Sequence, residues 1–149
     1  MKRTLEVQGQ LVDDKVQFTA STRENIPVQF DFFPPLGTGK GYTGLEGLLM
    51  SLAVCSATTL VYLLRKTGKT VAGCEVVAEG VTKELPAVGF ESADLYFDLT
   101  SPDVIPEDVD RALDLARESA CPVWQMVKGN FEISTSYKIR NFEESGTSR

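Results

Sequence analysis

The side chains best suited to covalent chemistry in this chain are three cysteines, Cys55, Cys74 and Cys121. The 149 residues include no histidine, which excludes Ser-His-Asp and Cys-His nucleophile pairs and the histidine-based zinc sites. The cysteines are far apart and form no Cys-x-x-Cys pair, so zinc ribbons and thioredoxin motifs are excluded as well. We therefore expect no metal site, and any chemistry must come from a thiol, a carboxylate, Lys, Arg, Tyr or Ser.

The sequence around each cysteine indicates whether its thiol is structural or reactive. Cys55 lies within an apolar stretch, residues 47–64, where composition alone indicates a buried structural thiol. Cys121 precedes Pro122 at the start of a predicted short helix, where free backbone N–H groups and the helix dipole can stabilise a thiolate. A small buried residue fits that position equally well. Cys74, on a predicted strand, is interpreted as structural.

The apolar stretch around Cys55 predicts a long helix from about Leu45 to Lys66. Thr43 or Gly44 serves as its cap, and Gly68 ends it. Its 18 uncharged residues, 47–64, are just within the length of a transmembrane span. Ser and Thr dilute this run, and the amphipathic segments on either side need an apolar element to cover them. We therefore expect a buried core helix and no membrane association.

The rest of the chain alternates between apolar and polar residues in short segments. A Pro- and Gly-rich loop follows the first three predicted strands, and its glycines lack the spacing of a P-loop. This order predicts an α+β fold with antiparallel sheets, one domain over residues 1–140 and a polar tail at 141–149. Strands are predicted at 5–11, 16–18, 28–32, 71–82, 90–100 and 131–139, and shorter helices at 106–119 and 123–128.

The net charge and the number of cysteines indicate which partners and which cellular compartment to expect. Fifteen Lys and Arg against 21 Asp and Glu give a net charge of −6, and no basic run exceeds Arg65-Lys66. Nucleic acid is therefore not expected as a partner. Three cysteines suit a secreted disulfide framework poorly, and the N-terminus becomes polar before an apolar signal region forms, so we expect a cytoplasmic protein.

Two motifs carry a resemblance to a known family. Residues 44–60, GLEGLLMSLAVCSATTL, resemble the central-helix signature of the OsmC/Ohr family, the osmotically inducible and organic hydroperoxide resistance proteins. Ser119-Ala120-Cys121-Pro122-Val123 resembles the second cysteine motif of that family. The likeness covers nearly the whole chain. It implies an OsmC-like fold, with antiparallel sheets around the long central helix, and an intertwined homodimer with two cysteine pockets at its interface.

The resemblance also implies a function, that of a thiol peroxidase acting on organic hydroperoxides. Cys55 would attack the peroxide and Cys121 would resolve the product through a disulfide, which an external dithiol reduces. No cofactor is implied. The alternative is an OsmC-like protein without efficient peroxide chemistry that binds a small apolar or thiol-reactive ligand in the same pocket. A third interpretation is a purely structural dimer.

The chain departs from the family around the predicted helix start. The family places a catalytic glutamate ten positions before the cysteine, preceded by a proline, whereas this chain has Leu45 and Gly44 there. Glu46 is the candidate catalytic carboxylate, although one residue along a helix rotates a side chain by about 100°.

The activating arginine of the family also lacks a clear counterpart, since Val12 occupies its aligned position, with Lys15 and Arg23 as neighbours. We therefore expect a Cys55 pKa nearer the unperturbed value of about 8.5 than that of an activated thiol.

Overall fold

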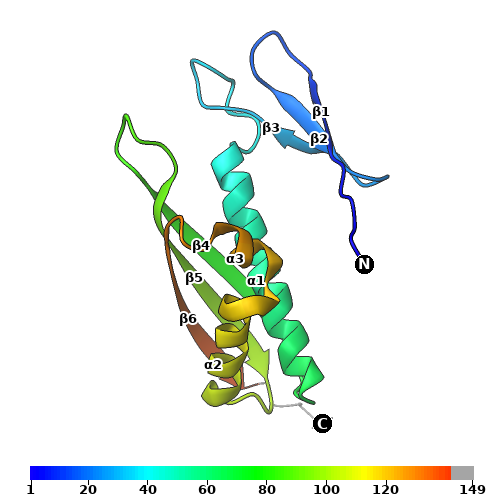
Figure 1. The fold of residues 1–149 in the computed structure, drawn as a ribbon, viewed down its shortest axis with the longest axis vertical. Helices are drawn as coiled ribbons and strands as arrows, with labels where there is room; N and C mark the ends of the chain where they lie inside the picture. The colour runs from blue at the N-terminus through cyan, green and yellow to red at the C-terminus, as the bar shows by residue number, and fades with distance from the viewer. Residues whose placement is uncertain (142–149) are drawn as a thin grey trace, which may run out of the picture. The chain divides into compact units, whose positions relative to one another are not determined.

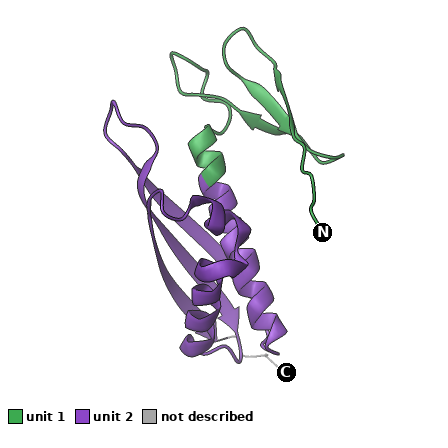
Figure 2. Ribbon diagram, viewed as in Figure 1, with its two compact units in different colours: residues 1–48 green, residues 49–149 purple. Residues whose placement is uncertain are grey.

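The computed structural model describes residues 1–141. These residues fall into two compact units, which divide between Leu48 and Leu49 (Figure 2). Helix α1, Gly44–Lys66, begins in the first unit and continues through the second. The predicted tail lies outside the described residues except for Asn141, which ends the last strand. Assignment of residues 1–140 to a single domain stays a prediction.

The first unit contains a three-stranded antiparallel sheet, as its alternating pattern predicts (Figure 1). Its strands are β1 Gln8–Leu11, β2 Phe18–Ser21 and β3 Val28–Phe30, in that order across the sheet. Phe18 at the start of β2 pairs with Leu11 on one side and with Phe30 on the other. Strands β1 and β3 are shorter than their predicted segments, 5–11 and 28–32, whereas β2 begins at the last residue of its predicted segment, 16–18, and continues to Ser21.

The loop between β3 and α1 is organised by one buried carboxylate, Asp31. It accepts hydrogen bonds from the backbone N–H groups of Phe32, Thr38 and Lys40 and from the Thr38 hydroxyl. The Thr38 hydroxyl and these N–H groups lower the pKa of Asp31 to about 2. Gly37 packs so closely that a Cβ there would collide with the Phe32 carbonyl and the Asp31 carboxylate. The Pro- and Gly-rich segment that the sequence predicts as a loop is therefore an ordered, hydrogen-bonded turn.

Helix α1 starts and ends with the signals that the sequence predicts. At its start the Thr43 hydroxyl accepts from the Glu46 N–H, and the Glu46 carboxylate accepts from the Thr43 N–H at 2.9 Å, a reciprocal capping box. At its end Gly68 has φ +85°, and the N–H of Lys69 returns to the Leu64 carbonyl at 3.1 Å.

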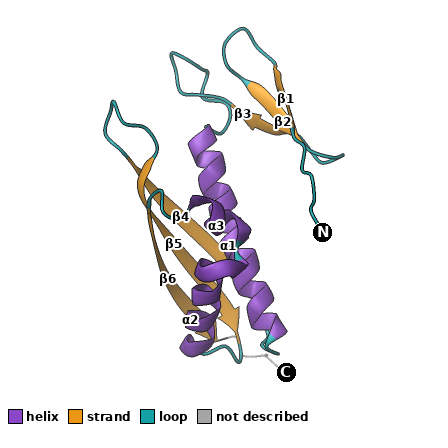
Figure 3. Cartoon of the chain, viewed as in Figure 1, coloured by secondary structure: helices purple, strands orange, loops and turns teal. Residues whose placement is uncertain are grey.

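In the second unit one face of a three-stranded sheet is packed against helices (Figure 3). The sheet has the order β4 Gly73–Thr82, β5 Phe90–Ser101 and β6 Glu132–Asn141. Along β5 the side chains alternate between buried and exposed, which puts the apolar set on the face toward the helices. The core joins that face to α1, to α2 Pro106–Leu115 and to the helical segment after it, through Leu52, Leu60, Leu64, Leu95, Phe97, Leu99, Val109, Leu113 and Trp124.

Two details of the second unit correct the expectations. The sheet is not wholly antiparallel, because β6 pairs with β5 in parallel. The helices between them return the chain to the end of the sheet where β5 began, so β6 runs in the same direction. The predicted helix 106–119 also changes form, since α2 is followed by a π-helical turn, Ala116–Ala120, and then by α3 Pro122–Val127.

Helix α1 is long and apolar enough to cross a membrane by length and composition alone, with a mean hydropathy of 1.9 over its 18-residue window. Its inner residues Leu52, Leu60 and Leu64 are no more than 1% exposed within the core of the second unit. Met50, Val54 and Tyr62 are exposed at 40 to 61%. The helix therefore has a core face, as expected, and an apolar stripe that the second unit leaves exposed.

Candidate active site

Helix α1 supplies the first half of the site through two consecutive residues. Cys55 is half-buried and carries a free thiol, and Ser56 is completely buried. Successive residues of a helix point about 100° apart, so the pair covers one sector of the helix surface.

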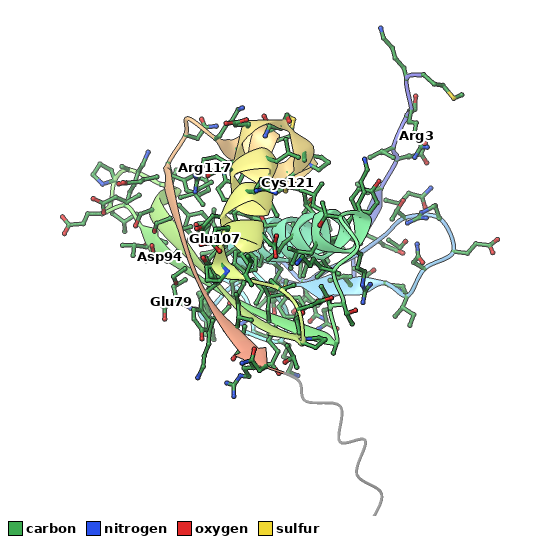
Figure 4. The ribbon with its side chains drawn as sticks, turned by 90° about the horizontal axis from the view of Figure 1, so that it is seen from below. Arg3, Glu79, Asp94, Glu107, Arg117 and Cys121 are labelled. Carbon is green, nitrogen blue, oxygen red and sulfur yellow. The ribbon has the colours of Figure 1, made fainter. Side chains whose placement is uncertain are left out.

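The second half of the site is Cys121, which lies where the π-helical turn meets α3 (Figure 4). Its N–H donates to the Ala116 carbonyl five residues back, at 3.2 Å, and its own backbone is extended. The Gln125 side-chain amide donates to the carbonyls of Ala116 and Arg117 at 3.3 and 3.0 Å. The wide turn and the glutamine bond together fix the backbone that carries Cys121, whose thiol is fully buried.

The fold brings Cys55 and Cys121 together, although 66 residues separate them in the sequence. Burial, the largest influence, raises the pKa of Cys55, because it disfavours the charged thiolate. The Val123 N–H, which donates to the Cys55 sulfur, acts in the opposite direction, and the neighbouring Cys121 raises the pKa further. The resting site therefore favours the neutral form of the Cys55 thiol, with Cys121 beside it.

The free backbone N–H groups at the start of α3 act on Cys55, whereas the sequence predicts that they act on Cys121. In the structure the N–H of Val123, in the first turn of α3, is directed at Cys55. Sequence spacing could not reveal this, because it depends on how α3 packs against α1.

Ser56 and Cys121 form a second contact between the two halves. The Ser56 hydroxyl lies 3.7 Å from the Cys121 sulfur, within hydrogen-bonding range for sulfur, and either atom can be the donor. Both side chains are 0% exposed. The sequence motif contains Ser56 but predicts no role for it, because its contact with Cys121 depends on how the helices pack.

A family profile described as OsmC-like protein matches residues 37–136, a range that contains both cysteines. The chain belongs to the OsmC family. Protein YhfA of Escherichia coli K12 is 32% identical over 100 residues, which make up 67% of this chain and 75% of YhfA.

Solved structures of other OsmC-like proteins share the fold. An OsmC-like protein from Mycoplasma pneumoniae has a TM-score of 0.80 at 20% identity, covering 95% of this chain and 100% of that one. The organic hydroperoxide resistance protein OsmC from Legionella pneumophila has a TM-score of 0.71 at 14% identity, covering 91% and 97%. These likenesses establish the OsmC fold, with two sheets and a central helix.

Glu46, the candidate catalytic carboxylate of this OsmC-like chain, serves as the cap of α1. Its carboxylate accepts a hydrogen bond from the Thr43 N–H. Glu46 lies nine residues before Cys55. In a helix nine residues amount to about 13 Å of rise and roughly half a turn of rotation. Helix α1 by itself thus directs Glu46 away from Cys55, and its catalytic role stays a prediction. Leu45 adds no charge at the helix start.

Cys74 lies on β4, apart from the paired thiols. Its thiol contacts the carbonyl of Glu75 at 3.9 Å, and burial together with the charge of Asp98 raises its pKa. It lines a shallow groove beside α1 with Val54, Ala57 and other apolar side chains. Across residues 1–141, no three His, Cys, Asp or Glu side chains are grouped closely enough to hold a metal ion.

Proposed function

We propose that this OsmC-like protein is a thiol peroxidase that reduces organic hydroperoxides, with Cys55 attacking and Cys121 resolving. The observation that carries the proposal is the contact between the Cys55 and Cys121 thiols, together with the Val123 N–H that donates to the Cys55 sulfur. A mechanism through a disulfide needs two cysteines whose Cα atoms lie within about 7 Å. Membership of the OsmC family supports the same chemistry, since one structural relative is named as an organic hydroperoxide resistance protein.

The order in which the two cysteines react follows from their exposure to solvent. Cys55 is half-buried, whereas Cys121 is 0% exposed, so a peroxide meets the Cys55 sulfur first. The Cys55 thiolate attacks the outer peroxide oxygen and breaks the O–O bond. The product is a sulfenic acid, and the alkoxide that leaves takes a proton to become an alcohol.

The resolving step then uses the buried neighbour. The Cys121 thiolate attacks the Cys55 sulfur, the S–OH bond breaks, and the hydroxide that leaves takes a proton to become water. An external dithiol supplies two electrons to the resulting disulfide and becomes a disulfide itself. The cycle requires no cofactor.

The exposed stripe of α1 supports a homodimer as part of the proposal. Met50, Val54 and Tyr62 form an apolar surface of the kind that oligomer interfaces cover. A second copy of the chain is the partner that we propose for it. A cytoplasmic location, where a reductant keeps the thiols cycling, belongs to the same proposal.

A second candidate function is binding of a small apolar or thiol-reactive ligand without efficient turnover. The raised pKa of Cys55 favours this alternative, because a neutral thiol is a poor nucleophile. Departures at Leu45 and Val12 from the family pattern favour it too.

A rapid-mixing assay with an alkyl hydroperoxide and thiol titration tests the proposal. We expect the wild type to consume one equivalent of peroxide per chain and to lose two thiols. Cys55→Ser should consume none, and Cys121→Ser should consume one equivalent and stop at the sulfenic acid.

The matched control is Cys74→Ser, which should behave like the wild type. If the wild type were inert at pH 9 while Cys55 remained open to alkylation, the peroxidase proposal would be wrong and ligand binding would take its place. Peptide mapping that placed Cys74 in the dominant disulfide would reject the pairing of Cys55 with Cys121.

A further inference from the structure

Ser56 presents a buried hydroxyl whose partner is a sulfur atom. Hydroxyl groups inside helices usually bond to the carbonyl four residues back or face the solvent. Thr59, one turn along α1, follows that rule and donates to the Cys55 carbonyl at 2.9 Å. Ser56 is 0% exposed, and its hydroxyl lies 3.7 Å from the Cys121 sulfur.

The contact crosses between the two elements that must cooperate in the resolving step. Cys121 is approached by Cys55 and by Ser56, which are consecutive residues of α1. With the two side chains about 100° apart on the helix, the Cys121 thiol faces the sector between them. A bond to Ser56 therefore limits the positions that this thiol can take beside Cys55.

Ionisation of Cys121 changes the nature of this bond. Either partner can donate while the thiol is neutral. A thiolate has no proton to give, so only the Ser56 hydroxyl can then donate, and hydrogen bonds to an ionised acceptor are stronger than neutral ones. The hydrogen bond between Ser56 and Cys121 is therefore strongest when Cys121 is a thiolate, the form in which it attacks.

We propose that Ser56 is a positioning residue for the resolving step. This inference rests on the proposed function, because it assigns Ser56 to the second half of that cycle. The Ser56 hydroxyl holds the Cys121 sulfur as it forms a bond to the Cys55 sulfur, and the S–OH bond of Cys55 breaks. The hydroxide that leaves is protonated to water, and Ser56 itself is neither oxidised nor reduced.

A single-turnover experiment on Ser56→Ala separates the two halves of the cycle. One equivalent of an alkyl hydroperoxide is added, peroxide consumption is followed by chemical quench, and disulfide formation is followed by mass spectrometry. We expect consumption to stay within about twofold of wild type and disulfide formation to slow about tenfold, the scale of one charge-assisted hydrogen bond. Ser56→Thr, which keeps the hydroxyl, should recover most of the loss.

Thr59→Val provides the matched control, since it removes a buried hydroxyl of the same helix whose hydrogen-bond partner is a backbone carbonyl, that of Cys55. It should leave the ratio of the two rates at the wild-type value. Equal slowing in Ser56→Ala and Thr59→Val would overturn the inference, because any loss of a helix hydroxyl would then suffice. Disulfide formation at the wild-type rate in Ser56→Ala would overturn it as well.

A thiol oxidant that needs no peroxide distinguishes this inference from the proposed function. Diamide adds to one thiolate, and the second thiolate displaces the reduced reagent as the disulfide forms. If the wild type consumed no hydroperoxide but Ser56→Ala still slowed the diamide-driven disulfide, the peroxidase function would fail and the positioning role would stand. If hydroperoxide were consumed normally and neither oxidant distinguished Ser56→Ala from wild type, the positioning role alone would fail.

Discussion

The rate of the first chemical step should depend steeply on pH, because burial keeps Cys55 protonated. The thiolate is the nucleophile, and its pKa is raised above that of an ordinary thiol, mainly by burial. Below that pKa, each fall of one pH unit lowers the thiolate fraction tenfold. An ordinary thiol is only about 3% ionised at pH 7, and Cys55 must be ionised to a smaller extent.

From pH 7 to pH 8 we therefore expect the second-order rate constant with an alkyl hydroperoxide to rise about tenfold. The rise should continue above pH 8. The measurement is peroxide consumption by rapid quench in Cys121→Ser, which isolates the first step because no resolving thiol is present. Wild type, measured in parallel, shows whether the substitution itself moves the profile.

The structure also predicts in which direction the pH profile of the rate constant shifts when Cys121 is replaced. The hydrogen bond and the charge of Cys121 both raise the pKa of Cys55, so Cys121→Ala should shift the profile toward lower pH. A rate constant that stayed flat between pH 7 and 8 in all three proteins would refute the reasoning. It would mean that Cys55 is already a thiolate and that a cation activates it.

Three further perturbations test other parts of the structure. Trp124→Ala removes a side chain that is 2% exposed and should lower the free energy of unfolding by about 3–5 kcal/mol, measured by denaturant titration; a loss below about 1 kcal/mol would contradict its place in the core. Glu46→Ala should cost about 0.5–1 kcal/mol through the lost capping bond to Thr43, and no change in unfolding would show that the cap contributes nothing. The pKa of Asp31 is lowered from 3.8 to about 2, so its stabilisation of residues 32–40 is present above pH 4 and lost as the pH falls through 2. Amide exchange of that loop should rise at neutral pH in Asp31→Asn, and equal protection in both proteins would refute the role of the carboxylate.

Local sequence signals predicted the helices and strands well because those signals act within a few residues. From the apolar run, with Thr43 before it and Gly68 after it, the sequence predicts that the helix begins at about Leu45. Helix α1 begins one residue earlier, at Gly44. The parallel direction of β6 was missed, since alternation shows which face of a strand is buried but not how its neighbour runs. The π-helical turn before Cys121 was missed too, because no residue type marks it.

The candidate site was predictable only in part, for the same reason. The family motifs identified Cys55 and Cys121 as a pair, and the structure brings them together. The donors around them, the Val123 N–H and the Ser56 hydroxyl, come from packing of α3 on α1 and leave no signature in spacing. Glu46 was selected for its chemical type, and the structure uses its carboxylate in a capping box.

Trp124 gives the chain a built-in optical probe of its redox state. It is the single tryptophan of the sequence, buried in α3 three residues after Cys121, with the Arg117 guanidinium 5.5 Å from the centre of its ring. Closing the bond between Cys55 and Cys121 changes the covalent state of a residue close to the indole in the chain, so we expect the emission of Trp124 to differ between the reduced and the oxidised protein. Emission from one native fluorophore can therefore follow reduced and oxidised protein in real time, without any label.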